Sequence, residues 1–318
     1  MLLERVDFMY DWEQKPTNAS GTQSHSGIQP SLRPVLAVSL GQIIWGFSTL
    51  FTKLALQFSE PDVLLSIRFL LSAFLMTLLI LFKKARVSFR GKKLKPLFLL
   101  AGSEVLYFYF ESYGIFYTNA IFAGVVLSVV PVVAIFLAMF FLKEFPTRRQ
   151  AFFCVLPVAG VIIMTAAGSS LGIIHPIGVV FLICSCISSA AYKTANRKSS
   201  EEFTPFERTY AVLVVSAAVF TISAIKTVSG DFRMYLVPLS QPTFLFSIFM
   251  LSVFCSVGSN MLVNYAAGRM PVVQLSSFGS LSTLCSMFAG MVFLNEPMTV
   301  SLLLGSVLIL TGIRYVTK

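Results

Sequence analysis

The chain alternates long apolar runs with short polar connections after a polar first segment. Ten apolar runs can be recognised, each close to the roughly 20 residues that a helix needs to cross the hydrocarbon core of a bilayer. The pattern therefore predicts an all-α integral membrane protein with ten transmembrane helices. The runs cover residues 35–56, 61–82, 96–117, 121–142, 149–167, 175–195, 205–226, 242–266, 271–294 and 298–316.

Proline marks the beginnings of these runs. It is tolerated in the first turn of a helix because the amides there lack intrahelical partners. Two other prolines, Pro131 and Pro157, lie deep inside runs, where we expect kinks. The prolines at or just before a predicted start are Pro34, Pro61, Pro96, Pro146, Pro176, Pro205, Pro242, Pro271 and Pro297.

Residues 1–34 differ from the rest of the chain. They are rich in Ser, Gln, Gly and Thr, and their first part carries four acidic residues. A secretory signal would have a basic start and then an apolar core, so this segment is not one. We expect a mostly disordered tail.

Composition excludes a soluble globular protein. Charged residues make up 12% of the chain, against about 25% in an average soluble domain, and the hydrophobic fraction is 56%. A disordered chain would lack this apolar content. The net charge of +10 does not indicate nucleic acid binding, because the basic residues lie mainly in the connections between apolar runs.

The basic residues also predict the orientation in the membrane. Of the 24 Lys and Arg, 18 lie in the tail, in the connections after even-numbered runs or at the C-terminal end. Two lie between runs 7 and 8, and four lie within runs. The positive-inside rule then predicts that both termini are cytoplasmic. No organelle presequence is visible, so we expect a multi-pass protein of the cell membrane, here a bacterial inner membrane.

The chain contains an internal repeat. Phe-Leu-Lys-Glu at 141–144 returns as Phe-Leu-Asn-Glu at 293–296, an offset of 152. Earlier in each half, Lys53 and Arg68 correspond to Lys193 and Arg208 at an offset of 140. A twelve-residue insertion between runs 7 and 8 reconciles the two offsets.

The repeat divides the chain into two five-helix halves, 35–167 and 175–316. Because five is odd, the second half enters the membrane from the opposite side. Many secondary transporters use such inverted-topology repeats for alternating access. The alternative is that the repeat is only architectural.

The sequence resembles the EamA-type transporters of the drug/metabolite transporter superfamily over residues 35 to 316. The resemblance implies a ten-helix bundle around a central cavity, lined by runs 1, 3, 4, 6, 8 and 9, and export or exchange of small metabolites including amino acids. Two departures are Thr283, where Pro131 would pair, and the absence of Trp in run 6. The matching motifs are Trp45-Gly46 with Lys53, Arg68-Phe69, Pro131 with Phe141-Leu142-Lys143-Glu144, and Phe293-Leu294-Asn295-Glu296-Pro297 with Thr299.

Two acids in run 3 are the sharpest candidates for function. Glu104 and Glu111 are seven residues apart and share a helix face with Tyr107. Burial disfavours a charged carboxylate, which suits proton coupling. Glu111 could instead hold a substrate ammonium beside Tyr107. The alternative for both acids is a structural role, satisfied by Lys, Arg or hydroxyl groups of neighbouring runs.

Four basic residues also lie within runs: Lys53 and Arg68 in the first half, and Lys193 and Arg208 in the second. They could act as symmetric gates, or they could anchor helix ends by reaching water. Glu144 and Glu296 end runs 4 and 9, where we favour capping and helix-end packing over substrate contact.

Six neutral side chains could line a cavity. Asn260 and Asn264 are one helical turn apart in run 8, so both can face inwards. Amides also join membrane helices without any further role, so the functional and structural alternatives stay open. The six are Trp45, Tyr107, Tyr113, Asn260, Asn264 and Gln274.

No motif of an enzyme is present. The sequence lacks a phosphate-binding GxxxxGK[ST] loop, so ATP-driven pumping by this chain is not expected. GxSxG and HExxH are absent too. The two histidines and five cysteines lack the spacing of a metal site, and we expect no metal and no cofactor.

The sequence therefore predicts a secondary transporter for a small organic metabolite, such as an amino acid or a related compound. We expect alternating access, with export as the direction and protons or exchange as the coupling. The partners are the lipid bilayer and the metabolite, and the oligomeric state is left open. The alternative is a non-transporting membrane sensor or assembly partner that acts through the tail. Deletion of the tail discriminates between them, because a transporter core does not need it for flux.

Overall fold

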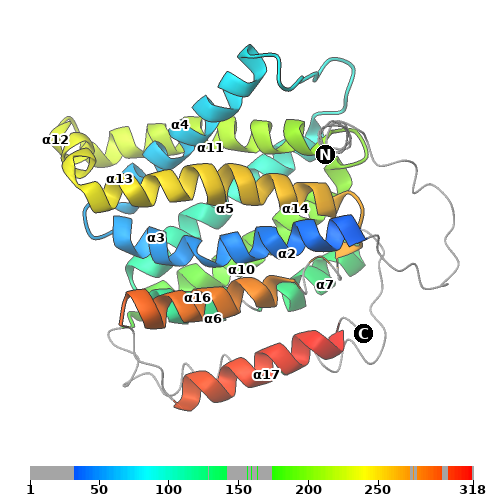
Figure 1. The fold of residues 1–318 in the computed structure, drawn as a ribbon, viewed down its shortest axis with the longest axis vertical. Helices are drawn as coiled ribbons and strands as arrows, with labels where there is room; N and C mark the ends of the chain where they lie inside the picture. Colours follow the sequence, from blue (N-terminus) through cyan, green and yellow to red (C-terminus); the bar gives the residue numbers. More distant parts are fainter. Residues whose placement is uncertain are drawn as a thin grey trace, which may run out of the picture.

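The chain forms a bundle of helices that lie roughly parallel or antiparallel (Figure 1). A computed structural model describes residues 32–127, 129–141, 174–272, 278–295 and 300–316, with isolated positions at 156, 159, 163 and 275. All regular elements among these residues are helical. Five helical stretches there are long and apolar enough to cross a membrane, namely Leu32–Ala55, Pro61–Leu81, Pro176–Ser199, Pro205–Val228 and Pro242–Ala267.

The helices follow the predicted apolar runs. In the first half they are α2 (Leu32–Gly46), α3 (Ser48–Ala55), α4 (Pro61–Leu81), α5 (Lys95–Phe116), α6 (Ala120–Leu127) and α7 (Val130–Phe141). In the second half they are α10 (Pro176–Ser199), α11 (Pro205–Val228), α12 (Arg233–Leu236), the 3₁₀ turn η2 (Val237–Ser240), α13 (Pro242–Phe249), the π-helix η3 (Met250–Ser259), α14 (Asn260–Ala267), α16 (Gly279–Phe293) and α17 (Val300–Val316).

Nine runs are thus confirmed as helical. Their ends agree with the predicted ones within four residues, except that the continuous helix of run 9 begins at Gly279. Run 5 (149–167) and the tail up to residue 31 lie outside the described residues. The first helix begins at Leu32, within the segment predicted as a tail.

Proline opens five of the described α-helices, at positions that the sequence predicts. It occupies the first turn of α4, α5, α10, α11 and α13. At α11 the Thr204 side chain also accepts a hydrogen bond from the Glu207 amide, while the Glu207 carboxylate accepts one from the Thr204 amide. This reciprocal capping box satisfies two amides that the helix itself leaves unpaired.

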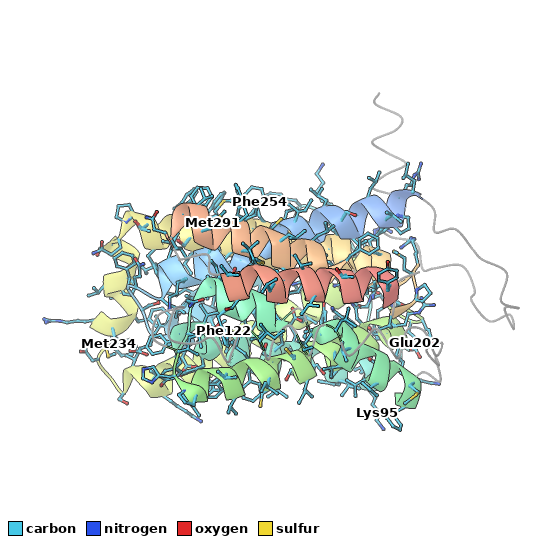
Figure 2. The ribbon with its side chains drawn as sticks, turned by 90° about the horizontal axis from the view of Figure 1, so that it is seen from below. Lys95, Phe122, Glu202, Met234, Phe254 and Met291 are labelled. Atoms are coloured by element: carbon cyan, nitrogen blue, oxygen red, sulfur yellow. The ribbon has the colours of Figure 1, made fainter. Side chains whose placement is uncertain are left out.

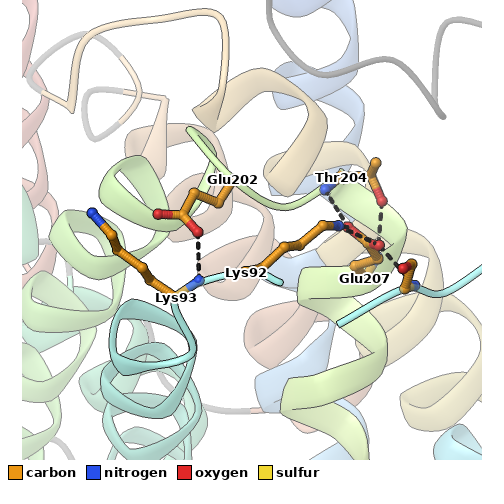
Figure 3. A network of polar contacts seen from close by, with 6 residues as sticks. Lys92, Lys93, Glu202, Thr204 and Glu207 are labelled. Carbon is orange, nitrogen blue, oxygen red and sulfur yellow. Dashed lines mark hydrogen bonds and ion pairs between the residues drawn. The ribbon is translucent and has the colours of Figure 1, made fainter. Parts of the chain in front are cut away.

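Glutamates at and just before the start of α11 bind the basic segment that precedes α5, which includes Lys92 and Lys93 (Figure 3). Lys92 Nζ lies 2.6 Å from both carboxylate oxygens of Glu207, and the Lys93 amide donates to Glu202. Lys95 and Glu202 lie at one end of the bundle and Met234 at the opposite end (Figure 2). These contacts fix the connection against the second half of the chain.

Three of the apolar runs depart from a continuous α-helix in the described residues, and the sequence predicted one of these departures. In run 4, α6 ends at Leu127 and α7 begins at Val130, directly before Pro131, because proline removes a hydrogen bond and crowds the preceding turn. Run 1 breaks at Phe47, and run 8 widens into the π-helix η3. The second predicted kink, at Pro157, lies outside the described residues.

Gly46 lets run 1 approach α16 closely. A Cβ atom at this position would lie 2.5 Å from the Cβ atom of Cys285 and 2.6 Å from the carbonyl oxygen of Ser282. Only glycine leaves room for this approach, which is the small-residue packing typical of membrane helices.

Helices of one half pack mainly against helices of the other half. The most extensive contacts join α5 to α10 and α4 to α11, and the first helix, α2 and α3, packs along η3 and α14. The buried core therefore lies between the halves. The outer surface carries large exposed apolar side chains such as Phe98, Phe140 and Ile222, which face lipid in a membrane protein.

Candidate functional site

A cavity lined by both polar and apolar side chains lies between the helices of the bundle. It offers about 70 Å³ to the centres of water-sized molecules. Its walls come from α2, α3, α5, α6, α7, α10, α14 and α16, which belong to runs 1, 3, 4, 6, 8 and 9. These are the runs that the family resemblance implied. Small polar side chains make up much of the wall: Gln42, Thr49, Ser189, Ser282, Thr283 and Ser286.

Three of the predicted side chains lie together in this wall. Tyr107 donates its hydroxyl to Glu111 Oε1 at 2.6 Å, one helical turn along α5. The Trp45 ring packs edge to face on Tyr107, with 6.1 Å between ring centres. Glu111 is 1% exposed, and its second oxygen, Oε2, has no hydrogen-bond partner in the described structure. The cavity wall therefore contains a buried carboxyl group with one oxygen that has no hydrogen-bond partner among the described residues.

Lys193 lines the same cavity from α10. It lies one helical turn after Ser189, on the same helix face, and the adjacent Tyr192 also lines the cavity. No described residue accepts a hydrogen bond from Lys193 Nζ or forms an ion pair with it. A basic group thus faces the cavity that Glu111 also lines.

Asn264 joins three helices beside the cavity. Its Oδ1 accepts hydrogen bonds from Tyr192 at 3.0 Å and from Asn196 Nδ2 at 2.6 Å, and its Nδ2 donates to Thr209 Oγ1 at 2.7 Å. Tyr192 also contacts Asn260 Oδ1 at 3.4 Å. This network ties α10, α11 and α14 together. Asn260 and Asn264 are buried inside the bundle, but neither lines the cavity.

Glu104 is separated from the cavity although it shares a helix with Glu111. It is fully buried, and its Oε1 accepts a hydrogen bond from Asn260 Nδ2 at 3.4 Å. Its Oε2 has no partner among the described residues, and Glu104 does not line the cavity. The two acids of run 3 therefore have different surroundings.

Two of the four basic residues within runs bind carbonyl oxygens at helix ends. Lys53 Nζ donates to the carbonyl oxygens of Ile115 at 3.1 Å and Thr118 at 2.7 Å, at the end of α5. Arg208 donates to the carbonyl oxygens of Asn196 at 3.0 Å and Asn264 at 2.6 Å, and to Asn196 Oδ1. These carbonyls lie in the last turns of α10 and α14, where a cation is favourable.

Arg68 remains inside the bundle and does not reach water. It is fully buried, and its Nε donates to Ser256 Oγ at 2.8 Å. Its guanidinium carbon lies 4.5 Å from the ring centre of Phe108, a cation–π contact. Arg68 and its counterpart Arg208 therefore differ in their partners.

The remaining predicted side chains do not meet at the cavity. Tyr113 donates its hydroxyl to Asp62 Oδ2 at 2.8 Å, and Ser223 and Thr227 donate to the same carboxylate at 2.9 and 2.8 Å. Tyr113 does not line the cavity, and its hydroxyl is occupied in joining α5 to α4 and α11. Gln274, Glu144 and Glu296 lie outside the described residues.

Sequence reasoning missed Tyr192 and most of the small polar side chains of the wall. The small residues resembled ordinary helix-packing positions, which membrane proteins also fill with Gly, Ala, Ser and Thr. The repeat held a signal, because Thr49 and Ser189 are 140 positions apart and both line the cavity. Tyr192 directly precedes Lys193, which had been singled out.

The chain resembles curated proteins that are named as transporters. It is 34% identical to the uncharacterized transporter YcxC of Bacillus subtilis (strain 168), over 87% of this chain and 90% of that protein. It is 26% identical to the uncharacterized transporter YvbV of the same organism, over 89% and 91%. An uncharacterized transporter of Archaeoglobus fulgidus is 23% identical over 89% and 98%.

The fold and the family agree with these relatives. A protein of known crystal structure aligns with a TM-score of 0.66 at 16% identity, over 89% of this chain and 96% of the other, which shows a shared fold. The EamA-like transporter family matches residues 32–166 and again residues 176–318. The chain therefore belongs to the EamA-like transporter family and is a membrane transporter.

Proposed function

We propose that this transporter moves a small organic metabolite, such as an amino acid or a related compound, by alternating access at the central cavity. In this proposal ten transmembrane helices form two inverted five-helix repeats, 35–167 and 175–316. The two halves rock around the cavity and expose it to either side of the membrane in turn.

The observation that carries the proposal is that equivalent positions of the two halves line one cavity. A substrate site on the pseudo-two-fold axis of an inverted repeat would be bounded in this way. Four pairs related by the offsets of 140 or 152 have both members in the wall: Thr49 with Ser189, Glu111 with Val263, Leu127 with Gly279, and Val130 with Ser282.

The packing between the halves supports the same symmetry. The contact of α5 with α10 corresponds, through the offsets, to the contact of α14 and η3 with α2 and α3, and both are extensive. Two equivalent interfaces between the halves are the arrangement that an inverted repeat with a pseudo-two-fold axis would produce.

Glu111 is the residue that we assign to coupling or substrate contact. It lines the cavity and is buried, its Oε1 accepts a hydrogen bond from Tyr107, and its Oε2 has no hydrogen-bond partner among the described residues. Such a group can bind and release a proton, or it can hold the ammonium group of a substrate. We further propose export across a bacterial cell membrane, with both termini cytoplasmic on the basis of the positive-inside rule.

Metabolite profiling of medium and cytosol tests the proposal. Cells that make the intact chain are compared with cells that make Glu111→Gln, at equal abundance in the membrane. We expect a small set of metabolites to move outwards with the intact chain and about 100-fold or more slowly with the variant, since loss of a buried charged contact costs about 3 kcal/mol.

Glu201→Gln is the matched control, because it removes an exposed carboxylate outside the cavity. It should export at the rate of the intact chain. Full export by a correctly inserted Glu111→Gln protein would contradict the assignment of Glu111. No movement of any metabolite with the intact chain would contradict export.

A further inference from the structure

The C-terminal ends of α5 and α14 are equivalent in the repeat, and each has its carbonyl oxygens bound by a basic side chain. In the first half the basic residue is Lys53, which binds Ile115 and Thr118 at the end of α5. The offset of 152 relates Ile115 to Ala267. Symmetry alone would have Lys193, the counterpart of Lys53, bind the carbonyl of Ala267.

Arg197 occupies that role in the second half. Its Nη1 donates to the carbonyl oxygens of Gly268 at 3.0 Å and Ala267 at 3.4 Å. Arg197 lies one helical turn beyond Lys193 on α10. The end of α14 is thus stabilised without Lys193.

Lys193 instead faces the central cavity, where no described residue accepts a hydrogen bond from its Nζ. A basic group without a partner is costly in the interior of a membrane protein unless it faces water or a ligand. The cavity also contains Glu111, which is 1% exposed and has an unpartnered Oε2. Two independent observations therefore point to a ligand with polar, charged ends.

We infer that Lys193 binds a carboxylate of the transported metabolite and selects for it, an inference that rests on the proposed function. A lysine ammonium offers three donors in a compact charge, which suits a carboxylate oxygen. The hydroxyl of Ser189, one helical turn before Lys193, lines the same wall and can donate a further hydrogen bond.

The first test is the exported set of metabolites. We compare the metabolites exported by four proteins at equal abundance in the membrane: the intact chain, Lys193→Gln, Lys193→Arg and Lys198→Gln. Lys198 is the matched control because it is an exposed lysine on the same helix. We expect the intact chain and Lys198→Gln to export compounds that carry a carboxylate. Lys193→Gln exports them about tenfold to 100-fold more slowly, and Lys193→Arg recovers part of the rate.

The outcomes separate the two proposals. Export of only neutral, purely cationic or phosphate-bearing compounds by the intact chain would overturn the inference and leave the transport function standing. Equal export of carboxylates by Lys193→Gln would do the same. No export by the intact chain would overturn the proposed function and this inference together.

A binding measurement covers the case in which Lys193→Gln fails to insert or fold. The chain has two tryptophans, Trp12 and Trp45, and Trp45 lines the cavity. In the purified Trp12→Phe chain, Trp45 fluorescence reports binding of the exported acid and of its carboxamide. We expect the acid to bind about tenfold or more tightly, and this preference to disappear in Lys193→Met. The inference would be overturned if Lys193→Met still preferred the acid to the carboxamide as strongly, or if the Trp12→Phe chain showed no such preference.

Discussion

The two halves of this transporter use different basic residues to bind the carbonyl oxygens at equivalent helix ends. Each half must satisfy carbonyl oxygens at the end of one helix, α5 in the first half and α14 in the second. Lys53 does this in the first half, and Arg197 does it in the second. Both halves therefore have the contact between a basic side chain and the helix end, but in the second half the basic residue lies one helical turn further along the chain. Lys193, which symmetry pairs with Lys53, became available to the cavity.

The paired arginines show the same divergence. Arg208 binds carbonyl oxygens of α10 and α14, whereas Arg68 binds the hydroxyl of Ser256 and packs on Phe108. Both side chains are fully buried. The two arginines at equivalent positions of the repeat are therefore equally buried, but they bind different partners.

Replacing the arginines one at a time gives the largest expected difference between the halves. Arg208→Met removes three hydrogen bonds from a charged donor, to the carbonyl oxygens of Asn196 and Asn264 and to Asn196 Oδ1. We therefore expect the free energy of unfolding to fall by about 3 kcal/mol or more. Arg68→Met removes one short hydrogen bond to a hydroxyl and leaves an apolar side chain on Phe108, so about 1 kcal/mol is expected. Thermal unfolding of the purified proteins in detergent gives the comparison.

Arg233→Met is the control, because Arg233 is exposed outside the spans. Its unfolding temperature should match that of the intact chain. An Arg208→Met protein no less stable than Arg68→Met would show that the carbonyl contacts contribute little, and the comparison of the halves would fail at this point.

The helix-end cations give the next largest effect. Lys53→Met and Arg197→Met should each lower the free energy of unfolding by about 2 kcal/mol, since hydrogen bonds from charged donors contribute about 1.5–3 kcal/mol. Lys193→Met removes no such bond, so its stability should equal or exceed that of the intact chain. Thermal unfolding of the three variants side by side measures this.

A destabilised Lys193→Met protein, together with an unchanged Arg197→Met protein, would reverse the assignment of the two residues. The export rate provides the complementary readout, because it should fall for Lys193→Met. For Lys53→Met and Arg197→Met the export rate per folded molecule should hold.

The sequence predicted the helices well because their signals are local. Apolar length, proline in the first turn and charge in the connections each depend on neighbouring residues, and nine runs became helices where expected. The interruption before Pro131 was predictable for the same reason. The π-helix η3 and the break at Phe47 were not, because they depend on packing. The need for glycine at position 46 likewise depends on packing, because it arises from the close contact with α16.

The site was predictable only in part. Glu111, Tyr107, Trp45 and Lys193 lie in the cavity, and acids and bases inside apolar runs are visible in a sequence. Tyr113 was assigned to the cavity by the same reasoning, but its hydroxyl binds Asp62. Which polar group finds which partner depends on contacts between distant runs, and spacing along one helix does not contain that information.

Alternating access requires that substrate passes through the cavity as the cavity opens to each side of the membrane in turn. Ser189→Cys, in a chain whose five cysteines are replaced, places a thiol in the cavity wall. Ser72→Cys is the control, since Ser72 is fully buried outside the cavity and hydrogen-bonded to the carbonyl of Arg68. A membrane-impermeant, charged thiosulfonate reagent is applied to either side of the membrane in separate experiments.

We expect Cys at position 189 to react from both sides of the membrane, and the exported metabolite to slow this reaction. Modification should stop export, while Cys at position 72 should stay unmodified. Reaction from one side only, or full export after complete modification, would contradict alternating access at this cavity.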